Sequence, residues 1–308
     1  MVERVLVIFL DGVGLGDDDP VVNPLAEADT PTLRALLGNE RLVRANGGHS
    51  SIQASLLALD ALLGVPGLPQ SATGQTTILT GVNAPALLGQ HDGPYPNHQL
   101  VDLLRNGNLF RHLLSAGLPV AFANAYPERF LNRIVRGTQR LSANTRAALL
   151  AGLKLRGPAD LKAGRAVSSL FTNEYFRQQG YDVPDVSPEE AGRHIARLAG
   201  DHALTYFEFW FTDVAGHRQN RELSLLILTQ LDRFVAGALS LLDTSRSLLL
   251  LISDHGNFED LRTPKHTMNP ALAFLVGADH REIAPRLHDL TDVAPALIAA
   301  LNGRAEAP

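Results

Sequence analysis

Five short runs of apolar residues constrain the fold of this chain most strongly. They cover residues 5–10, 118–123, 204–211, 248–252 and 271–276. The runs are continuous rather than alternating, which is typical of parallel strands covered on both faces. The segments between them have helical patterns, and strands that alternate with helices predict layers of both kinds. We therefore expect a three-layer α/β/α fold with a mostly parallel central sheet.

Helix signals lie between these runs. Thr30 and Pro31 form a typical helix start, with Thr as the N-cap and Pro in the first turn. Residues 99–116 and 224–242 are amphipathic at the helical period, so each segment predicts one helix packed on the sheet.

Residues 126–199 have a different character. They are rich in polar and charged side chains, contain helix-like segments such as 142–155, and have no convincing core strand. They end in a Pro- and acid-rich linker that leads into a helix capped by Ser187. We expect residues 126–199 to form a small inserted cap, and residues 1–125 and 200–308 to form the catalytic core.

Composition excludes several classes of protein. The chain has 308 residues, 45% of them hydrophobic and 19% charged, which is a normal globular balance. Its net charge of −5 predicts no general attraction to nucleic acid or to anionic membranes. It has no cysteine, which excludes disulfides and thiolate metal sites. No apolar run reaches the ~18 residues of a membrane span, so a soluble, cytoplasmic protein is expected.

Three of the apolar runs lead into an acid, namely Asp11, Asp213 and Asp254. The carboxyl ends of parallel strands form the ligand crevice of α/β sheets, so these acids are expected to lie close together. Three neighbouring carboxylates repel one another and raise one another's pKa unless a cation neutralises them.

Three histidines accompany the acids. His217 follows Asp213 by four positions, His255 is adjacent to Asp254, and His266 precedes the last run. Taken singly, each acid could be a helix cap and each Asp–His pair a simple hydrogen bond. Together they make six ligands of a kind suited to Zn, Mn or Co, too many for one catalytic ion. They predict a two-metal site, with ions ~3.5–4 Å apart that clamp a phosphoryl group.

The glycine-rich stretch FLDGVGLG, residues 9–16, could instead suggest a nucleotide loop. Its spacing is G-x-G-x-G rather than G-x-G-x-x-G, and Asp11 would repel a pyrophosphate. No G-K-[ST] motif of a P-loop occurs in the chain. A scaffold protein that keeps the fold without catalysis would not need all of the acids and histidines above. We interpret Asp11 as a metal ligand, with Gly12 and Gly14 giving a tight turn and clearance beside it.

A nucleophile is expected in the stretch QSATGQTTILTG, residues 70–81, which opens a helix. A helix N-terminus favours anions, and a Ser or Thr hydroxyl on a metal there can attack phosphorus. Ser71 or Thr73 could alternatively serve only as the helix cap. Composition does not choose among Ser71, Thr73 and Thr76.

Five stretches in this order, FLDGVGLG, QSATGQTTILTG, FTDVAGHR, SDHGN and KHTMNP, resemble the metal core of the alkaline phosphatase superfamily. They most resemble the branch with cofactor-independent phosphoglycerate mutase and phosphopentomutase. The resemblance covers roughly residues 1–125 and 200–308. It implies Ser71 as the nucleophile, three residues before Gly74. Gln75 stands where these relatives carry a histidine.

The resemblance also implies how the ligands divide between two metal ions. One set consists of Asp11, Ser71, Asp254 and His255, and the other of Asp213, His217 and His266. The ions would be Mn or Zn.

Phosphoryl transfer to Ser71 is the reaction that the resemblance implies, with a small-molecule phosphate ester as substrate. The chain is shorter than the two mutases, and its cap shows no mutase substrate motif, although Arg129, Arg133 and Arg136 could bind phosphate. We therefore favour a phosphatase. A phosphomutase is the alternative, and a phosphodiesterase fits less well.

Overall fold

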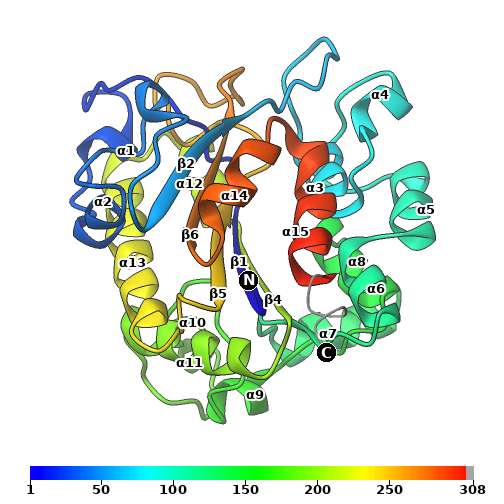
Figure 1. Cartoon of the computed structure of the whole chain (residues 1–308). Coiled ribbons are helices and arrows are strands. Elements are labelled where there is room, and N and C mark those ends of the chain that lie inside the picture. Colours follow the sequence, from blue (N-terminus) through cyan, green and yellow to red (C-terminus); the bar gives the residue numbers. More distant parts are fainter. Residues whose placement is uncertain (303–308) are drawn as a thin grey trace.

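A six-stranded sheet runs through the centre of the computed structural model, which describes residues 1–302 (Figure 1). In spatial order the strands are β2 (Ala54–Leu59), β6 (Ala271–Gly277), β5 (Ser247–Ile252), β1 (Arg4–Leu10), β4 (Leu204–Phe209) and β3 (Val120–Phe122). β1 pairs in parallel with β5 on one side and β4 on the other, and β4 pairs in parallel with β3. Only β6 runs against the others, so the predicted, mostly parallel sheet is confirmed.

The edge formed by β6 and β2 differs from the prediction. Residues 271–276 do form a strand, but the expectation that it is parallel was wrong, because β6 pairs antiparallel with both β5 and β2. A strand covered on both faces is apolar throughout whichever way it runs, so composition does not reveal its direction. β2 was not predicted at all. Its sequence, ASLLAL, consists of residues with little preference for strands.

Two layers of helices cover the sheet, one on each face. Alternate residues of a strand point to opposite faces, so Val7 and Phe9 of β1 lie in one core cluster and Ile8 and Leu10 in the other. Figure 1 shows α13 and α11 on one side of the sheet and α3, α6 and α15 on the other. The first cluster takes side chains from α3 (Ser71–Thr80), α5 (His98–Asn106), α6 (Leu109–Ser115), α8 (Ala143–Leu150) and α15 (Val293–Asn302). The second takes side chains from α2 (Pro31–Leu36), α11 (Pro188–Gly200) and α13 (Arg221–Leu239).

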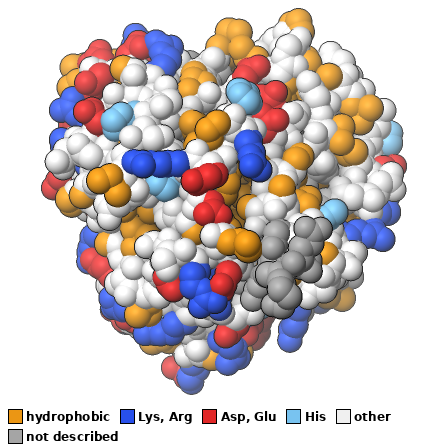
Figure 2. Space-filling view, in the orientation of Figure 1, with side chains coloured by type: hydrophobic (Ala, Val, Ile, Leu, Met, Phe, Trp, Pro, Cys, Tyr) orange, Lys and Arg blue, Asp and Glu red, His pale blue; other side chains and the backbone are white. Residues whose placement is uncertain are grey.

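Short helices complete the connections between these elements. They are α1 (Pro24–Glu27), α4 (Ala84–Leu88), α14 (His280–Ile283) and the 3₁₀ turns Arg44–Asn46, Ala284–Arg286 and Leu290–Asp292. On the face drawn in Figure 2, basic and acidic side chains are intermingled. Within residues 1–302, no helix is both long and apolar enough to cross a membrane.

The helix predictions were correct in place and partly wrong in extent. Residues 99–116 form two helices, α5 and α6, rather than one. Gly107 is extended between them, and the side chain of Asn108 caps α6 by accepting a hydrogen bond from the N–H of Arg111 at 3.1 Å. Thr30 does precede α2, but its side chain makes no capping hydrogen bond. Ser187 caps α11 as predicted, accepting from the N–H of Glu190 at 3.3 Å.

Residues 126–199 combine two kinds of packing. Three short helices, α7 (Glu128–Val135), α9 (Pro158–Lys162) and α10 (Glu174–Gln178), lie in this segment, and Leu161 and Phe176 form part of a small cluster of their own. By contrast, α8 and α11 pack into the two main clusters. The division of the chain into a core and an inserted cap stays a prediction.

Candidate metal centre

Asp11 and Asp254 lie side by side at the carboxyl ends of two paired strands. Asp11 follows β1 directly, and Asp254 comes two residues after β5. The N–H of Gly12 donates to Asp254 Oδ1 at 3.2 Å. Gly12 has a φ of +70°, and a Cβ at this position would lie 2.7 Å from Asp213 Oδ1. Glycine at this turn therefore lets three carboxylates approach one point.

The sequence predicted that Asp213 lies at the end of a strand, and this prediction was wrong. β4 stops at Phe209, and Asp213 lies in the first turn of α12 (Phe211–His217). Residues four apart in a helix share a face, so α12 brings Asp213 Oδ2 within 3.2 Å of His217 Nε2. Trp210 and Phe211 are apolar like the residues of β4 before them, so the sequence does not show where β4 ends and α12 begins.

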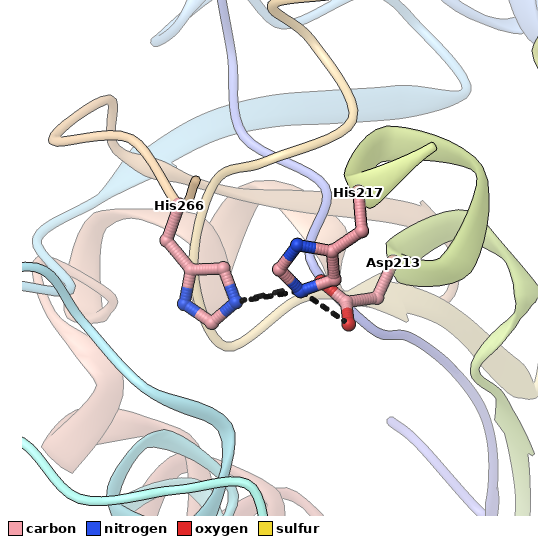
Figure 3. A group of neighbouring side chains, drawn as sticks. All are labelled: Asp213, His217 and His266. Carbon is pink, nitrogen blue, oxygen red and sulfur yellow. Dashed lines mark hydrogen bonds and ion pairs between the residues drawn. The ribbon is translucent and has the colours of Figure 1, made fainter. Parts of the chain in front are cut away.

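Asp213, His217 and His266 converge on one point (Figure 3). The Nε2 atoms of His217 and His266 are 3.3 Å apart, and His266 Nε2 is 3.6 Å from Asp213 Oδ1. His266 comes from the loop between β5 and β6, whereas the other two residues come from α12. We call this group the helix set.

The hydrogen bonds of the two imidazoles in the helix set orient them for a cation. Each Nδ1 lies 2.6 Å from a backbone carbonyl oxygen, that of Pro264 for His217 and that of Pro69 for His266. An Nδ1–H that donates to a carbonyl leaves the Nε2 lone pair free, an arrangement common among metal-binding histidines. Without a metal, the hydrogen bond to Asp213 raises the pKa of His217 to about 9. A cation would take the place of that shared proton.

The second group, which we call the strand set, consists of Asp11, Ser71, Asp254 and His255. Ser71 Oγ is 3.0 Å from His255 Nε2. The same nitrogen is 3.5 Å from Asp11 Oδ1 and 3.6 Å from Asp254 Oδ2. The other ring nitrogen of His255 lies 3.3 Å from the carbonyl oxygen of Gly256, which again leaves Nε2 to face the acids. Ligand atoms of Asp11, Asp213 and His255 also lie within 4.8 Å of one another, so the two sets adjoin.

The electrostatics of the strand set fit a cation. Burial, and then repulsion from Asp254, raises the pKa of Asp11 well above its usual value. Burial is also the main cause that raises the pKa of Asp254. Burial lowers the pKa of His255 to about 3, so this imidazole is neutral and able to bind a metal. Among the described residues, Asp11 Oδ1 is buried and has no hydrogen-bond partner. A divalent cation would satisfy this oxygen and remove the repulsion between the acids.

Ser71 is the hydroxyl of α3 that faces the acids. It is the first residue of the helix, and neither it nor Thr73 serves as the cap, since the N-cap position is Gln70. Thr73 and Thr76 are fully buried, and Thr73 Oγ1 donates to the carbonyl of Gln70 at 3.0 Å. Gly74 allows the close approach of α3, because a Cβ there would lie 2.8 Å from Asp254 Cβ.

Gln75 ties the strand set together. Its Nε2 lies 3.3 Å from Asp11 Oδ2 and 3.4 Å from Asp254 Oδ2, and its Oε1 accepts from the N–H of Ala143 at 3.2 Å. The sequence marked this position only as a departure from the relatives. The structure shows a neutral donor that bridges two carboxylates.

Sequence reasoning missed two supporting residues, Glu259 and Asn257. Glu259 is buried and accepts hydrogen bonds from the N–H groups of Gly14 and Asn257, both at 2.9 Å. Asn257 Nδ2 in turn donates to Asp213 Oδ1 at 3.0 Å. Asn257 stands in the SDHGN motif, which gave a signal, whereas Glu259 could have been noticed as an acid in an otherwise buried stretch.

A pocket of about 640 Å³ opens from Asp11, Ser71 and Asp213. Arg129 and Arg133 line it, as expected of phosphate-binding candidates, whereas Arg136 is not among its lining residues. Glu208 also lines the pocket, and burial raises its pKa.

The family profile of the metalloenzyme superfamily matches residues 3–304. The chain belongs to this superfamily. The curated relatives include 2,3-bisphosphoglycerate-independent phosphoglycerate mutases. That of Rhodopseudomonas palustris is 23% identical over 266 residues, which cover 71% of this chain and 52% of the mutase. That of Agrobacterium fabrum is 27% identical over 133 residues, or 40% of this chain and 26% of the mutase. The chain thus spans about a quarter to a half of the length of these relatives.

Solved structures share the fold of this metalloenzyme at low identity. The PH0037 protein of Pyrococcus horikoshii has a TM-score of 0.60 at 14% identity, with 98% of both chains covered. The alkaline phosphatase of the Antarctic bacterium TAB5 has a TM-score of 0.57 at 10% identity, again over 98% of both chains. Phosphoglycerate mutase of Leishmania mexicana has a TM-score of 0.55 at 11% identity, covering 98% of this chain and 95% of that one. The predicted membership of the alkaline phosphatase superfamily is confirmed.

Proposed function

We propose that this metalloenzyme is a two-metal-dependent phosphatase that hydrolyses a small phosphate ester through a phosphoserine on Ser71. The observation that carries the proposal is the position of Ser71. Its hydroxyl lies at the start of α3, 3.0 Å from His255 Nε2 and beside two buried carboxylates whose pKa values are raised. A serine placed beside a cation and at a helix N-terminus is suited to attack an anionic phosphorus centre.

The residues of the two sets suit two divalent ions, Mn or Zn. The strand set would hold one ion and the helix set the other, each through carboxylate and imidazole ligands. When bound, the ions supply positive charge that lowers the pKa of the serine hydroxyl and neutralises phosphoryl oxygens.

The proposed reaction has two steps. The Ser71 hydroxyl loses its proton to solvent, and its oxygen attacks phosphorus in line with the ester oxygen. The bond between phosphorus and the ester oxygen breaks, and the leaving alcohol takes up a proton from solvent. Water then attacks the phosphoserine, which releases inorganic phosphate and restores the Ser71 hydroxyl. Ser71 is the first residue of α3, so the helix backbone would limit the movement of its side chain during both steps.

A phosphomutase is the second candidate, and the names of the curated relatives favour it. In a mutase, a hydroxyl of the retained intermediate rather than water would attack the phosphoserine. Retention requires a closure that excludes water. The chain matches these mutases over only part of their length, so we do not carry their reaction over to it.

A substrate panel with the metal-loaded protein tests the proposal. Phosphate esters such as glycerol phosphates, sugar phosphates and nitrophenyl phosphate are supplied, and free phosphate is measured. We expect stoichiometric release of inorganic phosphate. Isomerised ester without phosphate release would favour the mutase, and absence of both products would contradict phosphoryl transfer.

A further inference from the structure

The pocket beside the metal centre is far larger than a phosphoryl group. Its volume is about 640 Å³, within the ~300–1,000 Å³ range of sites that enclose whole drug-sized ligands. A phosphoryl group has only a handful of heavy atoms, so most of this space lies beyond the reacting phosphorus. The remainder of the ester is the part of a substrate that would occupy it.

Aromatic side chains from two separate parts of the chain line this space. Tyr126 lies two residues before α7 and Phe130 lies in its first turn, with stacked rings 4.5 Å apart and 8° from parallel. Trp210 lies between β4 and α12 and Phe211 is the first residue of α12, with stacked rings 3.9 Å apart. Two pairs of flat rings therefore border the route to the metal centre, and flat surfaces of this kind favour a flat apolar guest.

Trp210 is the most informative of these residues. It is 42% exposed, although large apolar side chains are usually buried. It lies three residues before Asp213, so it is placed by the same turn that places a candidate ligand. It is also the only tryptophan in the chain. Its exposure leaves the ring accessible to a ligand in the pocket that it lines.

Positive charge lines the same pocket. Arg129, Arg133 and Arg140 are lining residues, and within residues 1–302 none of the three forms an ion pair with a carboxylate, although Arg129 donates to the hydroxyl of Tyr175. Arg140 lies over the ring of Tyr95, with its guanidinium carbon 5.5 Å from the ring centre. Arginines without an ion-pair partner attract an anionic ester towards the pocket, while the aromatic walls suit its uncharged part.

We propose that this pocket is the leaving-group site and that the leaving group carries an aromatic ring, which stacks beside Trp210. This inference rests on the proposed function, because it assigns the substrate class of the same site. It narrows the substrate from any small phosphate ester to an ester of an alcohol that bears an aromatic ring.

The fluorescence of Trp210 gives a test that does not depend on activity. Metal-loaded wild-type protein is titrated with 2-phenylethylphosphonate, which cannot be hydrolysed because carbon is bonded to phosphorus. Ethylphosphonate and 2-cyclohexylethylphosphonate serve as controls for the phosphonate and for apolar bulk. We expect a saturable change in tryptophan emission, with the phenyl compound binding at least about tenfold more tightly than either control. Equal affinities for the phenyl and cyclohexyl compounds, or no change in emission at saturation, would overturn the proposal.

Kinetics give the second test. The kcat/KM for 2-phenylethyl phosphate is compared with that for ethyl phosphate, because both leaving groups are simple alcohols of similar reactivity. We expect a ratio of about 10–100 in favour of the phenyl ester. Trp210→Ala should lower this ratio about tenfold. Leu226→Ala is the matched control, since Leu226 is 53% exposed on α13 and does not line the pocket, and it should leave the ratio unchanged.

The two tests separate failure of this inference from failure of the proposed function. Hydrolysis of both esters at equal kcat/KM, without a fluorescence response, would overturn the aromatic site and keep the phosphatase. A saturable response to the phenyl compound without hydrolysis of either ester would keep the aromatic site and overturn the phosphatase.

Discussion

The two candidate ligand sets differ chiefly in their access to water. In the strand set, the side chains of Asp254 and His255 are both 0% exposed. In the helix set, the side chain of His217 is 44% exposed, and that of Asp213 is 18% exposed. The strand set also contains Ser71, the proposed nucleophile, whereas the helix set contains no hydroxyl.

This difference in exposure suggests that the two sets have different roles. A buried set, held by paired strands and by Gln75, can fix an ion and the serine in one geometry, because its side chains have little freedom to move. A set that lies partly in solvent can exchange its ion and accept substrate oxygens. We therefore expect the strand set to bind metal more tightly than the helix set.

The largest expected effect comes from the proposed nucleophile, Ser71. Ser71→Ala should lower kcat by at least about 10³-fold and prevent formation of a trapped phosphoenzyme, because the attacking oxygen is absent. Thr80→Ala, at the other end of α3, is the matched control and should retain the phosphoenzyme. A phosphoenzyme that persists in Ser71→Ala would move the nucleophile to Thr73 or Thr76.

Substitutions of the candidate metal ligands test whether the strand set and the helix set differ in metal binding. His217→Ala removes a candidate ligand of the helix set only, so about one ion per chain should remain. His255→Ala should weaken the binding of both ions, because His255 lies beside Asp11 of the strand set and Asp213 of the helix set. Metal content measured during chelator titration of the wild type should fall in two stages, with the helix set emptied first. His288→Ala, a histidine whose side chain is 78% exposed, is the control. Simultaneous loss of both ions from the wild type would remove the distinction between the sets.

Gln75 should have a smaller effect that is confined to the strand set. Gln75→Ala removes the donor shared by Asp11 and Asp254, so we expect metal affinity there to fall about 10–100-fold, as for other residues that orient ligands. Competition with a metal-sensitive dye measures this change. An equal loss of affinity in both sets would indicate a general effect on the fold.

The smallest expected effect concerns the stability of the metal-free protein. Burial raises the pKa of Asp11, so the native state binds more protons than the unfolded state, and stability falls as the pH rises above the ordinary value of about 4. Asp11→Asn removes this loss. At pH 8 it should stabilise the metal-free protein by about 0.5–2 kcal/mol, with a smaller gain at pH 4. Thermal unfolding after chelation measures the difference, and destabilisation at pH 8 would contradict the account.

Much of the fold could be predicted from the sequence because buried strands appear in it as continuous apolar runs. The exceptions have physical reasons. The direction of β6 was predicted wrongly because an apolar composition does not distinguish a parallel strand from an antiparallel one. β2 was missed because Ala, Ser and Leu also occur commonly in helices. Gly107 divided one predicted helix into two, and the isolated glycine did not by itself reveal the break.

The residues of the candidate site were easier to recognise in the sequence than the contacts that support them. Its seven residues carry chemistry in their identity, and the structure brings them into two adjoining groups. What the sequence did not reveal was how they are supported. The backbone carbonyls that orient His217 and His266 have no side-chain signature, and the contacts of Gln75 join segments far apart in the chain. Such contacts depend on tertiary packing rather than on local pattern.

Anomalous diffraction from a crystal of the metal-loaded protein tests the central claim most directly. The account predicts two peaks per chain, one among Asp11, Ser71, Asp254 and His255, and the other among Asp213, His217 and His266, with full occupancy first in the strand set. The same protein stripped of metal should be inactive, and activity should return with Mn or Zn. A single peak outside both sets, or full activity without metal, would contradict the account.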